Sequence, residues 1–218
     1  MENPNALTKE QIIESVSDKY GITADRKKGF HPNVLAVFIE MGFNQIVFEV
    51  CKQAFAKNDY SVLDSYTKPY EAKIECNEKR NEWFCELPAP IIQLPMNRGI
   101  RLISPLQDRK INFIYRANGE SEIYENISGY SETQTIPTWY VENEKIFFDH
   151  RMTKELAEAG VLIKLVVPFR EWKDEDFLPL PSGQDFNIVQ VVEQIINGKQ
   201  KEQDRPTARP EASEQPKK

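Results

Sequence analysis

The stretch VLAVFIEMGFNQIVFEVCKQAF, residues 34–55, decides how the rest of this chain can be arranged. Fifteen of its 22 residues are apolar, which is too many for a surface helix that buries only one face. Pro32 stands just before it, and proline is well tolerated in the first turn of a helix. We therefore predict one long helix from about Asn33 to Phe55 that is apolar on two sides.

At 100° per residue, the apolar positions of this helix fall mostly into two stripes. The longer stripe contains Leu35, Ile39, Phe43, Ile46, Val50 and Ala54, and the shorter stripe contains Val37, Met41, Phe48 and Phe55. Such a helix is either central in its own domain or shared with a neighbouring subunit. Because soluble monomers rarely leave a contiguous apolar patch uncovered, we expect the longer stripe to face the subunit's own core and the shorter stripe to form a subunit interface.

A first, shorter helix precedes this segment. Thr8 and Gln11 have the spacing of a capping box, and Leu7 and Ile12 are placed to form the hydrophobic staple. Gly21 is a natural stop for this helix. We therefore predict a helix that begins after Thr8 and ends before Gly21.

A third helix is predicted near the other end of the chain. Ser182 and Asp185 follow a proline-marked turn at residues 179–181 with the spacing of a capping box. The helix is expected to run to about Asn197 and to end at Gly198. Its broad apolar face contains Ile188, Val189, Val191, Val192, Ile195 and Ile196. Residues 199–218 contain no aromatic, Ile, Leu, Val or Met residue, so we expect a flexible polar tail there.

Between the helices, from Pro69 to Phe169, the chain alternates apolar and polar residues and is interrupted by prolines and polar turns, which is typical of strands. The predicted strands are Tyr70–Cys76, Glu82–Leu87, Gly99–Ile103, Lys110–Tyr115, Thr138–Glu142, Lys145–Asp149 and Val161–Val167. Residues 141–146 indicate a tight hairpin, and residues 152–159 a helical turn closed by Gly160.

The predicted fold class is therefore α+β. We expect a helical N-terminal region at residues 1–66, which includes the long apolar helix, and a β-rich region at residues 67–169. Residues 170–198 should form a proline-marked loop and a C-terminal helix that packs on the helical region. Residues 199–218 should form the disordered tail.

Charge and hydropathy limit the classes of function. The chain has a formal net charge of −6, and residues 1–198 carry 22 Lys and Arg against 30 Asp and Glu. Nucleic-acid affinity that does not depend on sequence comes from Lys and Arg, so this body is not expected to hold DNA. No run approaches ~18 uninterrupted apolar residues, and the first residues lack the pattern of a signal peptide. We expect neither a membrane span nor export.

Motifs that carry catalysis or bind metals are absent from the sequence. There is no G-x-S-x-G, Walker, G-x-G-x-x-G or H-E-x-x-H pattern. The two histidines, His31 and His150, have no partner at metal-ligand spacing, and the acidic run at residues 174–176 lacks the EF-hand spacing. We predict no catalytic residue, no cofactor and no metal, with His150 at a strand end and the acidic run in a solvated loop.

The three cysteines, Cys51, Cys76 and Cys85, are expected to be reduced thiols. Cys76 and Cys85 flank the predicted turn at residues 78–81, so a disulfide across that hairpin is geometrically conceivable.

An aromatic cluster in the β-rich region leaves a second function open. It contains Phe113, Tyr115, Tyr124, Tyr130, Trp139 and Tyr140. Such rings could form a platform for a carbohydrate, although sheet cores and subunit contacts are the commoner places for them.

The last part of the body carries a resemblance to a known family. The apolar strand at 161–169, the segment Trp172–Phe177 and the turn at 178–185 that leads into an Ile/Val-rich helix resemble the ring proteins of crAss-like tailed bacteriophages. The likeness in layout covers about residues 7–198. It implies a non-enzymatic ring, twelve-fold like the portal, in the virion neck or tail, with portal, ring and tail proteins as neighbours. DNA would pass through it without specific binding, and no membrane would be involved.

Two hypotheses follow from the sequence. The first is a subunit of an oligomeric virion ring that connects the portal to the tail and is made in the bacterial cytoplasm. The second is a soluble binding module that uses the aromatic β-rich region to hold a glycan or a peptide. Assembly on purification favours the first, and a stable monomer favours the second.

Overall fold

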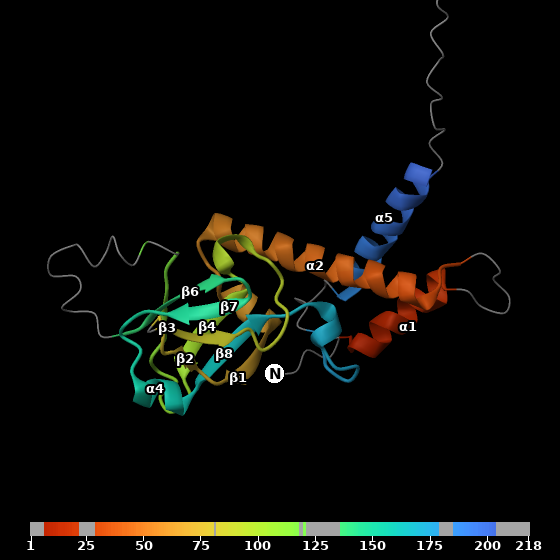
Figure 1. Ribbon diagram of the computed structural model, residues 1–218. Helices are drawn as coiled ribbons and strands as arrows, with labels where there is room; N and C mark the ends of the chain where they lie inside the picture. The colour runs from red at the N-terminus through yellow and green to blue at the C-terminus, as the bar shows by residue number, and fades with distance from the viewer. Residues whose placement is uncertain are drawn as a thin grey trace, which may run out of the picture.

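Figure 1 shows the computed structural model of the chain, which describes residues 7–21, 29–80, 82–117, 120, 136–178 and 185–203; in the last range the described side chains are those of 188–198. Both helices and sheets occur, so the expected α+β fold class is confirmed. The α-helices are α1 (Lys9–Tyr20), α2 (Pro32–Lys57), α4 (Lys154–Ala159) and α5 (Asp185–Gln203). The 3₁₀ turns among the described residues are η1 (Ser61–Tyr66), η2 (Pro95–Asn97) and η3 (Phe169–Glu171).

The strands of the described residues form two sheets. They are β1 (Thr67–Ala72), β2 (Glu75–Asn77), β3 (Glu82–Glu86), β4 (Ile100–Pro105), β5 (Ile114–Tyr115), β6 (Thr138–Glu142), β7 (Lys145–Phe148) and β8 (Val161–Val166). One sheet has the order β1-β8-β4 and the other has the order β2-β3-β7-β6-β5. The pairings among these strands are antiparallel except that of β5 with β6. The sheets therefore combine strands from distant parts of the chain.

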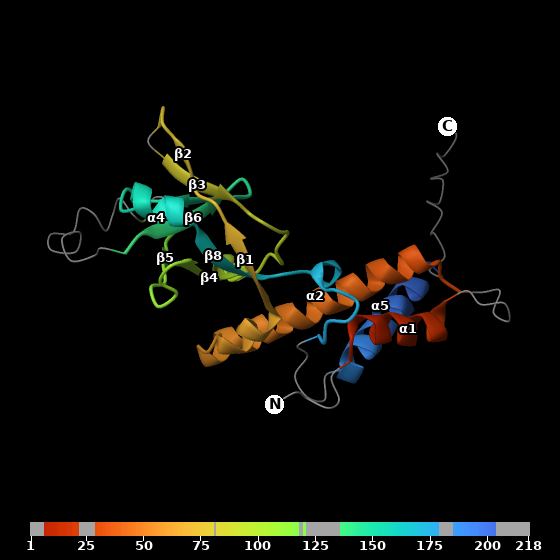
Figure 2. The ribbon, with the colours of Figure 1, turned by 90° about the horizontal axis from the view of Figure 1, so that it is seen from below.

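Helix α2 is the longest described element and connects the two parts of the molecule. Figures 1 and 2 show α1 and α5 against its N-terminal half, while the sheets lie toward its C-terminal half. Phe43, near the middle of α2, is fully buried; its ring lies 6.2 Å from that of Tyr66 and 5.7 Å from that of Phe169. The helical part and the sheets thus share one hydrophobic core.

Helix α1 begins as predicted. The Thr8 hydroxyl accepts a hydrogen bond from the Gln11 backbone N–H at 3.2 Å, and the Thr8 N–H donates to the Gln11 side chain at 3.0 Å. Both halves of the capping box are therefore present. Gly21 caps the other end, and its N–H bonds to the carbonyl of Ser17. A Cβ at Gly21 would lie 2.5 Å from that oxygen, which explains the glycine.

Helices α2 and α5 approach closely at a glycine. Ile188, Val192 and Ile196 of α5 are fully buried, and their spacing of four residues places them on one face. A Cβ built on Gly42 of α2 would lie 3.0 Å from the Val192 side chain. The absence of a side chain at position 42 therefore lets α5 pack directly on the backbone of α2.

We expect Gly42→Leu to destabilise the fold by about 1–3 kcal/mol, because a larger side chain overpacks this contact. Gly198→Ala is the matched control. It lies inside α5, and a Cβ added there would have no described atom within 4 Å, so the change should be neutral or stabilise by up to ~1 kcal/mol. Urea unfolding of both variants measures the two effects, and equal stability of Gly42→Leu and the parent would contradict the packing described.

The end of α5 differs from the prediction. The helix continues through Gly198 to Gln203 rather than ending at the glycine. Glycine inside a helix costs only about 1 kcal/mol relative to alanine, and Lys, Gln and Glu at residues 199–203 are good helix formers. The first residues of the predicted tail are therefore helical, and its remainder at 204–218 lies outside the described residues. The predicted cap at Ser182, before the other end of α5, also lies outside them.

The predicted strand Tyr70–Cys76 is two strands in two different sheets. Residues 67–72 pair with β8, whereas residues 75–77 pair with β3. Lys73 and Ile74 stand between the two pairings and belong to neither strand. Alternation along the sequence continues through this junction, so the pattern could not reveal that the chain changes partners.

The predicted strand Lys110–Tyr115 is reduced to the two residues of β5. Asp108 begins a turn in which its carboxylate accepts the Lys110 N–H at 3.0 Å and its carbonyl accepts the Ile111 N–H at 3.2 Å. An Asp that bonds to the backbone two residues on is typical of a turn. Only Ile114 and Tyr115 then remain to pair with β6.

The predicted hairpin at residues 141–146 is confirmed. Strands β6 and β7 pair antiparallel, and Asn143 and Glu144 at the turn have φ angles of 49° and 61°. Two central residues with positive φ are what a two-residue turn of the right twist requires.

The helical turn closed by Gly160 is also present as α4, and Gly160 has a φ of 77°.

The three cysteines are free thiols. Cys76 lies opposite Trp83 in the β2–β3 pairing, so Cys76 and Cys85 are not directly paired across the hairpin. Cys76 is exposed, whereas Cys51 and Cys85 are buried. Burial raises the pKa of Cys85 to about 12, which keeps this thiol protonated and unreactive.

By length and composition, α2 also meets the requirement for a membrane-spanning helix. An 18-residue window of it has a mean hydropathy of 1.7, and 44% of that window is buried within the structure. The expectation of no membrane span rested on uninterrupted apolar runs, and averaged hydropathy does not support that exclusion. The core helix of a folded domain passes the same test, and α2 has a buried core face.

Candidate subunit interface

The shorter apolar stripe of α2 is exposed. The exposed fractions of Val37, Met41, Phe48 and Phe55 are 56%, 43%, 38% and 64%. All members of the longer stripe, by contrast, are buried at 8% exposure or less. The predicted burial of the two stripes is therefore confirmed, while the contact of the exposed stripe with a neighbouring subunit stays a prediction.

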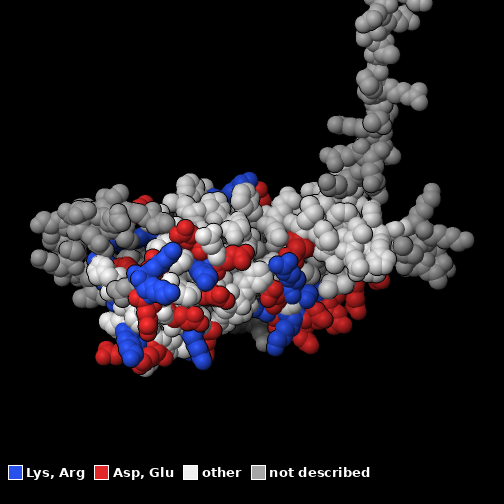
Figure 3. Space-filling view, viewed as in Figure 1, with Lys and Arg blue, Asp and Glu red and all other residues white. Residues whose placement is uncertain are grey.

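The exposed stripe extends further than the four residues predicted from the sequence. Val34 is also 41% exposed, and Val34, Met41, Phe48 and Phe55 follow one another at intervals of seven residues. A seven-residue interval keeps side chains near one side of a helix. Figure 3 shows a largely uncharged surface over α2, whereas charges of both signs are interspersed over the sheets.

Near the C-terminal end of α2 the stripe becomes one wall of a groove of about 390 Å³. The groove is lined by Phe48, Cys51, Lys52, Phe55, Tyr60, Pro95 and Met96. Apart from Lys52 and the Tyr60 hydroxyl, these are apolar groups. The groove therefore combines the exposed stripe with residues from two other segments of the chain. We call it the α2 groove.

The far wall of the α2 groove is a constrained turn. Met96 is 63% exposed and has a φ of 56°, and Asn97 follows with a φ of 53°. The Asn97 side chain donates to the Tyr115 hydroxyl at 2.9 Å, and the Arg98 guanidinium lies 4.0 Å from the Tyr60 ring centroid. A left-handed conformation is unfavourable for methionine. The fold nevertheless holds this apolar side chain out toward solvent.

Lys52 lies at the rim of the groove. Its Nζ is 5.0 Å from the Phe48 ring centroid and 2.8 Å from a Glu49 carboxylate oxygen. Its alkyl stem can cover apolar surface while the ammonium stays in water. Cys51 lies deeper, and desolvation raises the pKa of its thiol, opposed by the charges of Arg98 and Arg101. Cys51 therefore acts as a packing group in the groove.

A second, more polar hollow lies on the other side of Phe48. Glu40, Asn44, Gln93 and Arg170 contribute to its lining. The Arg170 backbone N–H donates to the Glu40 carboxylate at 3.0 Å. Asn44 Oδ1 is buried and has no hydrogen-bond partner among the described atoms. Phe48 thus stands as a ridge between an apolar groove and a polar hollow.

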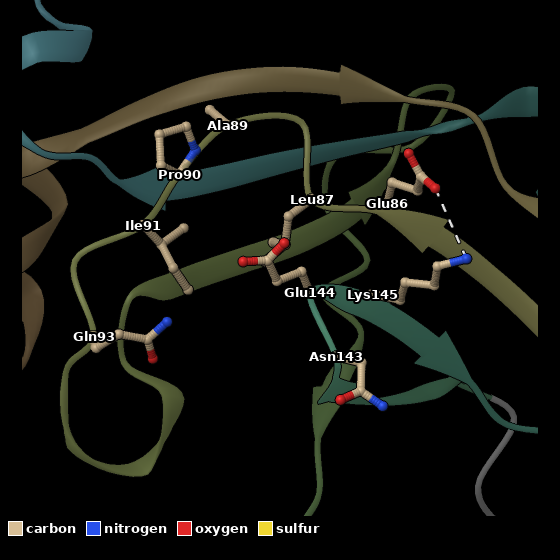
Figure 4. A pocket seen from close by; sticks show the side chains of 9 residues that line it. All are labelled: Glu86, Leu87, Ala89, Pro90, Ile91, Gln93, Asn143, Glu144 and Lys145. Atoms are coloured by element: carbon tan, nitrogen blue, oxygen red, sulfur yellow. Dashed lines mark ion pairs between the residues drawn. The ribbon is translucent and has the colours of Figure 1, made fainter.

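A third hollow lies between the β6–β7 turn and the segment after β3 (Figure 4). Figure 4 shows the Lys145 side chain directed toward Glu86, and their charged atoms are 3.8 Å apart. The Leu87 N–H bonds to the Glu144 carbonyl at 3.1 Å and so joins the two walls. The charged groups of Glu86 and Lys145 at this hollow are directed toward each other.

The turn that contains His150 is held by a buried ion pair between its neighbours. His150 is exposed in a turn, as expected. Its neighbours Asp149 and Arg151 form a buried ion pair, and the Thr138 hydroxyl donates to Asp149 at 2.9 Å. This pair fixes the chain where it leaves β7.

The acidic run at residues 174–176 is tied to two lysines. Asp174 lies 3.1 Å from Lys9 Nζ, and Asp176 accepts from Lys68 Nζ at 2.6 Å. The hydrogen bond from Lys68 is the main cause that lowers the pKa of Asp176. Among the described residues, no three His, Cys, Asp or Glu side chains gather to hold a metal ion.

The aromatic cluster is largely part of the sheet core where it is described. Phe113 and Trp139 are buried, and the Trp139 indole donates to the Phe113 carbonyl at 3.3 Å. The Tyr115 ring packs 4.9 Å from that of Trp139. Tyr140 stacks instead on Phe147 at 5.3 Å. Tyr124 and Tyr130 lie outside the described residues.

Of the predicted interface residues, the structure brings Phe48 and Phe55 together in the α2 groove and leaves Val37 and Met41 nearer the N-terminal half of the same face. Val34 could have been found from its seven-residue spacing. Met96 could not, because its place beside α2 depends on the tertiary fold.

Comparison of the chain with models of known protein families and with curated proteins finds no match.

Proposed function

We propose that the protein is a non-enzymatic structural subunit that assembles into a homo-oligomeric ring, with the exposed face of α2 in the contact between neighbours. The observation that carries this proposal is the uncovered row Val34, Val37, Met41, Phe48 and Phe55 beside a fully buried core stripe. Monomers rarely expose a large apolar patch. A repeated contact around a rotation axis would remove such a patch from water on every copy.

The setting of this ring is proposed from the resemblance of residues 161–185 to ring proteins of crAss-like phages. In that setting the ring would lie in the virion neck or tail, connect the portal to the tail and surround the DNA channel, with twelve copies to match the portal.

Native mass spectrometry of the purified full chain tests the assembly. We expect a discrete closed oligomer, with twelve copies as the specific expectation, and a population that increases with protein concentration. A chain that stays monomeric at concentrations of about 0.1 mM and above would contradict the proposal. It would instead favour a soluble binding module, for which glycan or peptide binding by the β-rich region would be the next measurement.

We expect the full chain to have little affinity for free duplex DNA, although the proposed ring surrounds a DNA channel. Its net charge of −6 is opposite in sign to that of a surface that binds phosphates. A gel shift at about 0.15 M salt should show no complex at micromolar protein. Tight binding that weakens steeply with added salt would contradict this expectation.

A further inference from the structure

A second exposed aromatic side chain lies elsewhere on the same subunit, at Phe177. It is 60% exposed. It follows η3 and lies where the chain passes beside the start of α1 (Figures 1 and 2). The α2 groove is built instead from the C-terminal end of α2, the residue that precedes η1, and η2. One subunit thus presents a groove and a protruding ring in different places.

The segment that carries Phe177 is held firmly. The backbone N–H groups of Lys9 and Glu10 donate to the carbonyls of Asp176 and Asp174, each at 3.2 Å, and the Leu178 N–H donates to the carbonyl of Leu7. The Asp176 carboxylate also accepts the Lys173 N–H at 2.9 Å. Phe177 is therefore presented from a pre-formed loop, which lowers the entropy cost of using it as a binding anchor.

One exposed acidic residue beside Phe177 and two lysines near the α2 groove carry opposite charges. Of the three acidic residues that directly precede Phe177, Asp174 and Asp176 are already paired with Lys9 and Lys68 of the same subunit, while Glu175 between them is exposed. Figure 3 shows acidic side chains gathered over the adjoining α1. Lys52, at the rim of the α2 groove, forms a surface ion pair with Glu49, and Lys57 lies at the end of the same helix. Complementary charges at the edge of a contact select the partner and its orientation.

We propose that Phe177 of one copy seats in the α2 groove of the next copy, with Glu175 against Lys52 and Lys57. This inference rests on the proposed function and specifies its contact. Because the two surfaces differ, the contact is head-to-tail, and repeating it closes a ring or continues as a filament. The occupant of the groove is thus a second copy of this chain.

Two variants test the contact through complementation. Phe177→Asp removes the anchor and leaves the groove intact, whereas Met96→Asp places a charge in the groove and leaves the anchor intact. Position 96 has a positive φ, which Asp tolerates better than most residues. Each variant alone should be a folded monomer by circular dichroism and light scattering. Their equimolar mixture should form a one-to-one dimer and stop there, because only one intact pair of surfaces remains.

Two further variants check that the effects come from the contact. Phe177→Ala should weaken assembly by about 30-fold or more, as expected for a central aromatic anchor. Lys52→Glu should also weaken assembly, and Glu175→Lys in the same chain should restore part of the loss. Ile111→Asp is the matched control: Ile111 is an exposed apolar residue outside both surfaces, and its substitution should leave assembly unchanged.

The outcomes separate this inference from the proposed function. If the parent chain is monomeric, the proposed function fails and this contact with it. If the parent assembles but Phe177→Asp assembles equally well, the inference alone is overturned. It is also overturned if both variants are folded monomers whose mixture gives no dimer, or if the α2 face pairs with its own copy, since Phe177→Asp would then still dimerise.

Discussion

Phe43→Asp should unfold the chain. Phe43 has no exposed surface and packs against the rings of Tyr66 and Phe169, so it joins α2 to the elements that flank the sheets. A carboxylate placed there would be buried in the hydrophobic core, which costs several kcal/mol in addition to the lost packing. Native domains have only about 5–15 kcal/mol of stability, so the native state should be lost.

Circular dichroism and thermal unfolding measure this effect. Phe43→Ala serves as the milder variant, because it removes the ring without adding a charge and should cost about 3–5 kcal/mol. It should retain a cooperative transition at a lower temperature. If Phe43→Asp unfolded cooperatively near the temperature of the parent chain, the ring of Phe43 could not be in the core, and the assignment of the longer stripe would be wrong.

Phe48→Asp should abolish assembly and leave a folded, more soluble monomer. Phe48 is only five residues from Phe43 but is 38% exposed, and it forms the ridge between the α2 groove and the polar hollow beside it. A carboxylate there remains in contact with water in the monomer, so the cost to folding should be limited to about 1–2 kcal/mol for the covered part of the ring. In an assembly the same charge would be buried in an apolar contact, where it is strongly unfavourable.

Light scattering and circular dichroism on Phe48→Asp separate folding from assembly. Ile111→Asp is the control, because it changes an exposed apolar residue of similar exposure and should assemble like the parent. If Phe48→Asp unfolded the chain, both stripes would belong to one core. An assembled Phe48→Asp would instead remove the α2 face from the interface, and the proposed ring would lose its main physical support.

Local signals in the sequence predicted the helices well because each depends on residues close in sequence. Thr8 and Gln11 form the predicted capping box, and Pro32 begins α2 as expected. The two stripes of α2 followed from helical periodicity alone, since the angular position of a side chain depends only on its number along the helix. The positive φ angles at Asn143 and Glu144 likewise belong to a turn that its own residues indicated.

Pairing between distant segments could not be predicted in the same way. The alternation through residues 70–76 is continuous, yet the chain leaves β8 and joins β3 within it. Which strand pairs with which depends on contacts distant in sequence, and alternation carries no information about the partner. The short β5 is a further case, because a single turn at Asp108 decided how many residues remained to pair.

The sequence by itself determined that α2 has two apolar stripes, because helical periodicity is a local property. A small helical layer can cover only one of them. The longer stripe is the covered one, as predicted, but only the tertiary structure decided which segments cover this side of α2: α5 packs at Gly42, and Tyr66 and Phe169 pack around Phe43. It also decided that Met96, 41 residues beyond Phe55 in the chain, completes the α2 groove. Burial is a property of the whole arrangement, since a side chain is covered only when another segment arrives to cover it.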